Sequence, residues 1–474
     1  MIRPVKLLAI VAAASFSLSA VAQAPTASIG KTPPRTWVDK DTGHRIFRVT
    51  DEPNSTGFYF NVNAYTPDLK TMIYTAPDGI HTMDMATRKT KLLVPNPPRP
   101  ADADGGQQFR FGGVHAIIAG RVTNSVFYTM ADPATHTTAI YKADVYSGQI
   151  AKLTDLPKGM GVATINADET LGAGTINDVQ NATEYGANRV NPPGMAAGPL
   201  VQPANKGEMM EARLKARTPL TLNTIDLRTG KVTMLFHSTD WIGHMLFSPK
   251  DPTLLMYCHE GPWQKVDRIW MIHTDGTHNT LIHKRNIAME IAGHEFWGLD
   301  GQTIWYDWQP IKGQDFYLAG YDLATGKRTA FHMERNEWSI HFNLTKDLDV
   351  FTGDGGDSGQ VAKAPDGEWI ELFHPQMLRV DSDALNDPNF FQPGIFHSEH
   401  LVNMKQHNYK LEPNVRFSPD KSLVFFTSNM FGPSYVFAVE TAKATDIKPG
   451  ELLSTPELAA SFNPGKPAPT PPNK

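Results

Sequence analysis

The stretch VRFSPDKSLVFFT, residues 415–427, places a polar turn between two short apolar runs. Its first run ends at Phe417, and the Ser-Pro-Asp sequence that follows is typical of a tight turn. The second run, Leu423–Thr427, is rich in β-branched and aromatic residues that favour strands. We therefore expect two antiparallel strands here, connected by a short turn.

The same pattern recurs along the chain as an internal repeat. An apolar segment runs into a turn at Tyr65–Asp68, Ile165–Asp168, Phe247–Lys250, Trp297–Asp300, Leu344–Asp347 and Phe417–Asp420. A second turn, of the form Asp-x-x-Thr/Ser-Gly, closes a hairpin at Asp144–Gln149, Asp226–Lys231 and Asp322–Lys327. Short strands in groups of four, at a period of roughly 45–50 residues, are typical of a β-propeller.

We therefore predict an all-β fold, a seven-bladed β-propeller with two loop or helix insertions over one face. The blades are expected to start near residues 61, 108, 160, 242, 292, 338 and 412, although the pattern is also compatible with six or eight. Arg45–Thr50 is expected to supply the outer strand of the last blade and so close the ring. The insertions are 177–217, where Lys206–Arg217 predicts a short basic helix, and 375–411. Such excursions often build or cover a binding site, although surface decoration is the alternative for the second.

The ends of the chain differ from the propeller, which is expected to span 45–450. Two basic residues precede an apolar run, and the small residues around Ala22 fit a cleavage site, so 1–22 predicts a secretory signal peptide. An uncleaved membrane anchor is the alternative. After cleavage, an extension over 23–44 would precede the propeller, and the protein would be periplasmic or secreted. The Pro-rich stretch within 451–474 predicts a disordered tail.

The overall charge argues against two classes of partner. The formal net charge is −5 at pH 7 and there is no polybasic run. We therefore expect neither nucleic acid nor, after signal cleavage, a membrane as the main partner. Cys258 is the only cysteine, so no internal disulfide can form.

Three histidines fall at one register of the repeat. Counting back four positions from the second residue of each turn gives His244, His294, His341 and, in the last blade, Asn414. Because the innermost strands of a propeller run alongside one another, we expect these side chains to meet near one end of the axis. A lone strand histidine is usually a packed core residue. Three at one register, in a chain with 17 histidines, favour a functional site.

Two strings near these histidines hold further candidates. His259 lies in Cys-His-Glu-Gly-Pro-Trp, residues 258–263, where a strand ends at a Gly-Pro break. Arg268 follows on the next expected strand. Trp263 is a candidate platform for a sugar ring, although packing between blades is the more common use of such aromatic residues.

Several strings are more specific than the turns that propellers share. They are Gly243-His244, Cys258–Pro262, Val266–Arg268, His294–Trp297 and Val350–Asp357. With them, the chain resembles the oligogalacturonate lyase family of polysaccharide lyases over about residues 45–440. The resemblance implies a seven-bladed propeller that cleaves short oligogalacturonides by β-elimination with a bound, manganese-like divalent cation. It also implies that His294 is the base, Arg268 the catalytic arginine and His341 a metal ligand.

The resemblance also has departures. The family takes its other metal ligands from a Gln-x-x-His-x-His string, and the matching positions here are Tyr409, Glu412 and Asn414. This more oxygen-rich set suits Mn²⁺, Ca²⁺ or Mg²⁺ better than zinc, and we expect Mn²⁺. The best-known members are also cytoplasmic, without a signal peptide. The expected contacts to the acidic oligosaccharide substrate are His244, His259, Trp263 and His407.

These residue types suit elimination from a uronate. Removing the C5 proton beside an ionised carboxylate requires a base and a positive charge that stabilises the developing enolate. A neutral histidine is a suitable base, and a cation or an arginine supplies the charge. The sequence therefore predicts an exported lyase for uronate oligosaccharides. The alternatives are a non-catalytic propeller that binds glycans or peptides, and the same chemistry on a different acidic glycan, which the basic segment Lys206–Arg217 favours.

Overall fold

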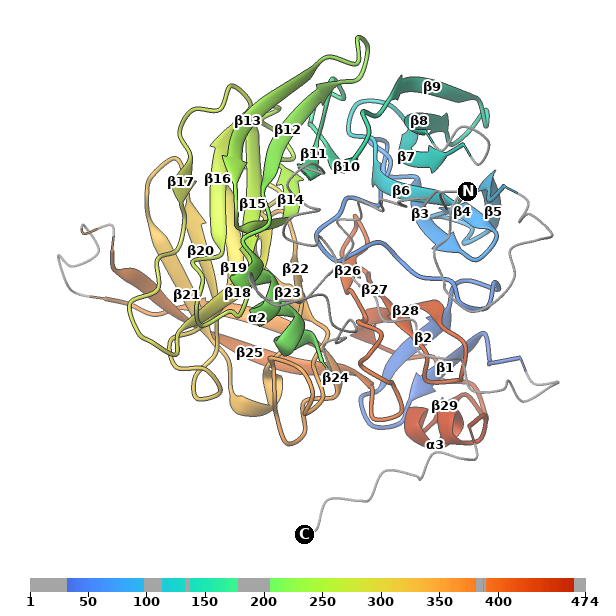
Figure 1. Ribbon diagram of the computed structural model, residues 1–474. Coiled ribbons are helices and arrows are strands. Elements are labelled where there is room, and N and C mark those ends of the chain that lie inside the picture. The colour runs from blue at the N-terminus through green and yellow to red at the C-terminus, as the bar shows by residue number, and fades with distance from the viewer. Residues whose placement is uncertain are drawn as a thin grey trace, which may run out of the picture.

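The fold is nearly all β-strand. The computed structural model describes residues 32–463 except for 98–112, 133–136, 178–204, 381–386 and 388. In these residues the strands form mainly antiparallel sheets that stand around a common centre (Figure 1). The predicted all-β propeller fold is therefore confirmed. The predicted signal peptide lies outside the described residues, and none of the described helices has the length and apolar character needed to cross a membrane.

Four of the sheets are antiparallel meanders in chain order. The first holds β3 (Thr71–Ala76), β4 (Gly79–Asp84) and β5 (Thr90–Pro95). The second holds β6 (Val114–Ala119), β7 (Ser125–Ala131), β8 (Thr138–Asp144) and β9 (Ile150–Asp155). The third holds β10 (Met160–Ile165), β11 (Leu171–Asn177), β12 (Leu220–Asp226) and β13 (Val232–Ser238). The fourth holds β14 (Trp241–Phe247), β15 (Leu254–Glu260), β16 (Ile269–His273) and β17 (Thr280–Leu281).

An eight-stranded sheet contains the next two predicted blades. One half holds β18 (Ile291–Trp297), β19 (Thr303–Gln309), β20 (Tyr317–Asp322) and β21 (Arg328–His332). After the short 3₁₀ helix η1 (Arg335–Glu337), the other half holds β22 (Phe342–Leu344), β23 (Phe351–Gly353), β24 (Trp369–Met377) and β25 (Phe391–Asn403). The halves join because β25 pairs in parallel with β21. Since two predicted blades share one sheet, the count of seven blades stays a prediction.

The last sheet closes the ring by joining the two ends of the described chain. It holds β26 (Arg416–Phe417), β27 (Leu423–Ser428), β28 (Tyr435–Lys443), β2 (His44–Arg48), β1 (Thr36–Asp39) and β29 (Leu452–Leu453). Strand β2 pairs antiparallel with β28, as predicted for the segment that begins at Arg45. It is not the outermost strand, because β1 and β29 extend the sheet beyond it.

The predicted limits of the propeller were therefore too narrow. The tail expected from residue 451 begins with β29 and continues into helix α3 (Thr455–Ala460). The indole N–H of Trp37 in β1 donates to the buried hydroxyl of Thr455 at 2.8 Å. Leu453 and Leu458 also pack against the core. These contacts fix the first part of the tail, and the Pro-rich part from 464 lies outside the described residues.

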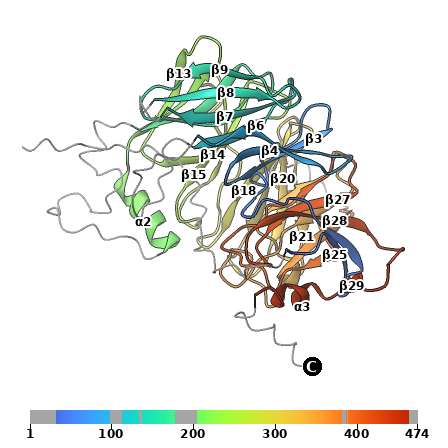
Figure 2. The ribbon, with the colours of Figure 1, turned by 90° about the vertical axis from the view of Figure 1, so that its right-hand side faces the viewer.

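The two predicted insertions have different outcomes. The basic helix expected at Lys206–Arg217 is present as α2 (Lys206–Ala216), capped by the side chain of Asn205. Figure 2 shows α2 standing off one side of the sheets. Within the insertion predicted over 375–411, the end of β24 and all of β25 belong to one antiparallel pair, which includes residues 375–377 and 391–403.

The hairpin turns follow the predicted pattern. The carboxylate of Asp144 accepts the backbone N–H of Ser147 at 2.7 Å, and that of Asp226 accepts the N–H of Thr229 at 2.6 Å. The glycines of these two turns, Gly148 and Gly230, both have a φ of 72°, which other residues rarely adopt. The turns place the first strands side by side, since β10 contacts both β6 and β14, and β22 contacts β26.

Candidate active site

Three residues of the predicted register share an unusual backbone conformation. His244 in β14 and His294 in β18 lie where the pairing to the next strand shifts register, and their φ values are 47° and 44°. Asn414, just before β26, has a φ of 57°. Non-glycine residues in this region cost about 1–3 kcal/mol and persist only where the surroundings enforce them. The shared distortion marks these positions as equivalent in the repeat.

The structure brings the three histidines together. The ring of His341, just before β22, lies 4.8 Å from that of His294, measured between centroids. Tyr59 packs edge-on against both His341, at 5.1 Å, and His244, at 5.9 Å, so it joins the two rings. Phe60 stacks on His341 at 4.5 Å and thereby covers one face of that imidazole. The histidines converge through two aromatic residues of the segment before β3.

His294 has the geometry of an oriented, neutral imidazole. Its Nδ1 lies 3.2 Å from Oδ2 of Asp307 in β19, and its side chain is almost fully buried. Burial, with a further contribution from the charge of His341, holds the pKa of His294 well below its usual value. Burial also raises the pKa of Asp307 to about 7. With Nδ1 engaged, Nε2 is the nitrogen left to act on a ligand.

His341 is held by a buried carboxylate. Its Nδ1 lies 2.8 Å from Oδ2 of Asp354, and both side chains are fully buried. Burial alone would lower the pKa of His341, but the charge and hydrogen bond of Asp354 raise it. On the other side of the ring, Nε2 lies 3.2 Å from the hydroxyl of Tyr59 and 3.7 Å from Oε2 of Glu412. Nε2 of His341 and the carboxylate of Glu412 therefore face each other.

His244 belongs to a separate buried charge network. Its Nε2 lies 2.9 Å from Oε1 of Glu260, and its Nδ1 lies 3.7 Å from Oε1 of Glu295. Burial lowers the pKa of His244, but the charge and hydrogen bond of Glu260, together with the charge of Glu295, outweigh burial and raise that pKa. Glu260 also forms a 3.1 Å ion pair with Arg268, which is buried with its guanidinium 4.4 Å from the ring centre of Trp263. Arg268 is therefore committed to Glu260 and lies behind Trp263.

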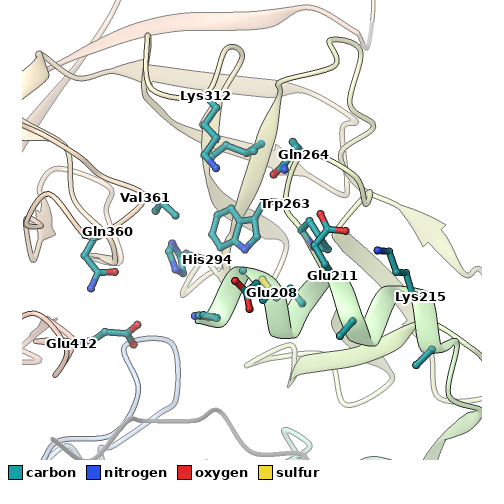
Figure 3. Close-up of a pocket in the computed structure, with 18 residues that line it drawn as sticks. Glu208, Glu211, Lys215, Trp263, Gln264, His294, Lys312, Gln360, Val361 and Glu412 are labelled. Carbon is teal, nitrogen blue, oxygen red and sulfur yellow. The ribbon is translucent and has the colours of Figure 1, made fainter. Parts of the chain in front are cut away.

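A cavity of about 710 Å³ opens beside this cluster. Figure 3 shows Trp263 projecting into it next to His294, with Glu412 on the far side and α2 along one wall. The rings of Trp263 and His294 are 4.9 Å apart, so the indole forms a surface beside the imidazole. Arg268, His244 and His341 do not line the cavity. Of the predicted site residues, His294, Trp263 and Glu412 are the ones that face a space large enough for a ligand.

Two predicted substrate contacts lie elsewhere. His259 stacks on Trp270 of the next strand at 5.0 Å and does not line the cavity. Both ring nitrogens of His407 are engaged, Nδ1 with the hydroxyl of Ser428 at 2.9 Å and Nε2 with the carbonyl of Leu411 at 2.6 Å. The sequence placed both near the axis, but each side chain faces its own sheet or loop.

The four predicted metal ligands are reduced to two by geometry. Tyr409 is fully buried and donates its hydroxyl hydrogen to the carbonyl of Asp354 at 3.0 Å. The side-chain amide of Asn414 uses both of its polar atoms on main-chain groups. Within the described ranges, no group of three or more His, Cys, Asp or Glu side chains is arranged to hold a metal ion. Nε2 of His341 and the carboxylate of Glu412, 3.7 Å apart, would be the two side-chain groups to hold a divalent cation, with water or substrate as its other ligands.

Several residues of the cluster escaped sequence reasoning. Asp307 could have been found as the cross-strand partner of Gly293. Asp354 and Glu260 each lie inside a string that carries the family resemblance. Tyr59 precedes the first repeat, and no signal in the sequence connects it to the histidines. Fully buried Glu295 follows His294 directly in the sequence, and its Oε1 lies 3.7 Å from Nδ1 of His244.

The fold and the clustered site define a β-propeller protein with an oriented histidine beside a ligand cavity. Residues 211–444 match a family model described as oligogalacturonate lyase, which confirms the resemblance that the sequence predicts. An oligogalacturonide lyase of Pectobacterium atrosepticum is 28% identical over 228 residues, which are 44% of this chain and 52% of that protein. An oligogalacturonate lyase of Dickeya dadantii is 27% identical over 220 residues, which again are 44% of this chain and 52% of that protein. The match spans about half the length of these relatives.

Solved structures show the same fold over a longer part of the chain. An oligogalacturonate lyase in complex with manganese superimposes with a TM-score of 0.63 at 19% identity, over 86% of this chain and 96% of that one. An oligogalacturonate lyase of Vibrio parahaemolyticus gives a TM-score of 0.62 at 19% identity, over 87% of this chain and 97% of that one. The common fold therefore extends well beyond residues 211–444.

Proposed function

We propose that this protein is a lyase that cleaves uronate-containing oligosaccharides by metal-assisted β-elimination, with His294 as the base. The observation that carries the proposal is the pair formed by His294 and Asp307 at the edge of the cavity. The match of residues 211–444 to the oligogalacturonate lyase family model supports the class of substrate. A neutral imidazole with one nitrogen anchored and the other directed at a ligand is suited to take a proton from carbon.

The elimination requires one proton to leave C5 and one bond to break. Nε2 of His294 takes the C5 proton, the electron pair forms the C4–C5 double bond, and the bond from C4 to the glycosidic oxygen breaks. The leaving oxygen takes a proton from water. Asp307 keeps the imidazole in the required tautomer and stabilises the imidazolium that forms.

The substrate carboxylate needs a positive charge because the developing enolate adds negative charge to it. A divalent cation, for which we propose Mn²⁺, would supply that charge from a position between His341 and Glu412. Asp354 orients His341 for this task by holding its other nitrogen at 2.8 Å. The guanidinium of Arg268 is already paired with Glu260, so Arg268 would not contact the substrate directly. It would act through Trp263, because the guanidinium lies 4.4 Å from the centre of the indole ring and supports it.

A panel of acidic oligosaccharides, assayed for the ultraviolet absorbance of an unsaturated product, tests the proposed activity. We expect product from trigalacturonate in the presence of Mn²⁺. Product only from another uronate oligosaccharide would retain the chemistry and correct the substrate. Binding of these oligosaccharides without product would favour the alternative, a propeller that binds glycans. The side chains of Tyr409 and Asn414 support this alternative, because both are bonded to main-chain groups and not available to a metal ion.

We also propose that the protein is exported, on the basis of the signal-like residues 1–22. The mature protein would then meet its substrate in the periplasm or outside the cell. Fractionation of cells that make the full chain, followed by N-terminal sequencing, tests this proposal. A protein that is found in the cytoplasm with its first residues intact would contradict it.

A further inference from the structure

Lys312 presents a positive charge at the wall of the same cavity. It follows β19 in a short loop, and Figure 3 shows its side chain extending toward Trp263 and His294. Among the described residues, no carboxylate forms an ion pair with its ammonium group, and the side chain is exposed. An ammonium group that faces a cavity and lacks an acidic partner is available for an anionic ligand.

The backbone around Lys312 is fixed by a buried glutamine. Gln309, which is fully buried, accepts the N–H of Gly313 at 2.6 Å and donates to the carbonyl of Val361 at 3.1 Å. The N–H of Lys312 itself donates to the carbonyl of Met289 at 3.1 Å. One side chain therefore ties together two loops that line the cavity. The base of Lys312 is held in place, while its long side chain can still adapt to a ligand.

Other basic residues near the cavity are less suited to bind an anion beside the base. Arg268 is buried and paired with Glu260. Lys265 pairs with Glu211 at 2.6 Å. Lys215 lies at the end of α2 away from His294 (Figure 3). Lys206, at the start of α2, also lines the cavity and is exposed, but Lys312 is the lysine that Figure 3 shows extending toward Trp263 and His294 from a loop held by Gln309.

We propose that Lys312 binds a carboxylate of the oligouronide beside His294, in a subsite whose second wall is the ring of Trp263. The inference rests on the proposed function and names the feature of the substrate that the site selects, a free carboxylate. Pockets of this kind combine an apolar surface with a few fixed polar groups, and the polar groups set the specificity. Lys312 therefore discriminates acidic oligosaccharides from neutral or esterified ones of the same shape.

Direct binding tests the subsite separately from catalysis. Isothermal titration calorimetry of the full chain is carried out with trigalacturonate and with its fully methyl-esterified form, in chelator-treated samples, so that turnover does not consume the ligand. For Lys312→Met we expect the affinity for trigalacturonate to fall about 10- to 100-fold, the range for one charge-assisted hydrogen bond. The affinity for the esterified form is expected to stay unchanged. Lys312→Arg should restore part of the loss, because it returns the charge.

The matched control is Lys346→Met, an exposed lysine in the turn after β22. It removes the same charge from the molecule, and we expect it to leave both affinities unchanged. An equal loss for both ligands, no loss in Lys312→Met, or no binding of trigalacturonate by the unchanged protein would each overturn the subsite. Absence of unsaturated product, with binding that still depends on Lys312, would overturn the proposed function and leave the subsite standing.

Discussion

The side chains of His294 and Asp307 face each other across β18 and β19, with Nδ1 of the imidazole 3.2 Å from Oδ2 of the carboxylate. Asp307 is the cross-strand partner of Gly293, and the pairing shifts register directly after Gly293, where His294 has a φ of 44°. The distortion that breaks the strand pairing is thus the same one that aims the proposed base.

The first prediction concerns this pair. Asp307→Asn should lower kcat by about 10- to 100-fold, the effect usual for a residue that orients a functional histidine. The amide can donate to Nδ1 and thereby select the tautomer whose Nε2 already carries a proton. KM should change little, because the cavity wall is unchanged. Initial rates at varied trigalacturonate concentrations measure both constants.

Asp315→Asn is the matched control for that experiment, since it changes an exposed aspartate that follows the same strand. Its kinetics should match those of the unchanged protein. A rise in KM for Asp307→Asn without a fall in kcat would argue that Asp307 shapes the cavity and does not orient the base.

The second prediction concerns the base itself. His294→Ala should reduce formation of the unsaturated product by about 10²- to 10⁴-fold, the range for loss of a general base. The melting temperature should change little, because removing the ring leaves a space that already adjoins the cavity. His237→Ala, at an exposed position of β13, is the control. Near-normal turnover in His294→Ala would remove this residue from the mechanism.

The third prediction separates the two oxygen-bearing side chains of the predicted metal set. Glu412→Ala should raise the Mn²⁺ concentration needed for half-maximal activity by more than about tenfold, because a charged ligand is lost. Asn414→Gly should leave that concentration unchanged, since the amide is bonded to main-chain groups and glycine accepts the φ of 57°. Chelation should abolish activity in the unchanged protein. If Asn414→Gly raised the required Mn²⁺ concentration and Glu412→Ala did not, Asn414 would be the residue that holds the cation.

The fourth prediction concerns the buried ion pair of Glu260 and Arg268. Arg268→Met should lower the free energy of unfolding by about 3–5 kcal/mol, because it removes the arginine partner of the buried Glu260 charge and leaves that charge to His244 alone. Glu260→Gln in the same chain should recover part of that loss. Although burial alone would raise the pKa of Glu260, the charges of Arg268 and His244 and its hydrogen bonds to both hold that pKa well below its usual value. The stabilisation is therefore present above about pH 4.5 and disappears as the pH falls further.

Urea unfolding at neutral and acidic pH measures both effects. The free energy of unfolding of the variant that combines Arg268→Met with Glu260→Gln should depend less on pH below about 4.5 than that of the unchanged protein does. Equal stability of Arg268→Met and the unchanged protein would mean that water reaches Glu260 in solution.

The sequence predicted the fold well because propeller strands are local. Each hairpin is set by its own turn, such as the one at Asp226, and the closing pair of β2 and β28 follows from the need to cover sheet edges. The 13-residue strand β25 was missed because it pairs with β21 of the preceding half-sheet, and no local signal encodes such a contact. The first part of the tail was missed for the same reason, since Trp37 anchors Thr455 across most of the chain.

For the site, register predicted which residues converge but not where each side chain points. His244, His294 and His341 do meet, because equal positions in a repeat occupy equal places around the axis. Arg268 and Asn414 are present at the expected positions, yet their polar groups are used by Glu260 and by the main chain. Side-chain direction depends on bulges and on buried partners from distant strands, and a pattern of residue types does not contain either.

The fifth prediction follows from the close approach of Gly293 to Trp263. A Cβ at position 293 would lie 2.5 Å from Cζ3 of the indole, so Gly293→Ala must displace the ring. We expect the free energy of unfolding to fall by about 1–3 kcal/mol, as for other overpacked sites. We also expect KM for trigalacturonate to rise, because the indole ring forms part of the cavity wall. Protein from which metal has been removed should still bind Mn²⁺ normally, because the facing groups of His341 and Glu412 do not involve the indole ring. Steady-state kinetics with calorimetric metal titration separate the two effects, and an unchanged KM would show that substrate does not use the indole surface.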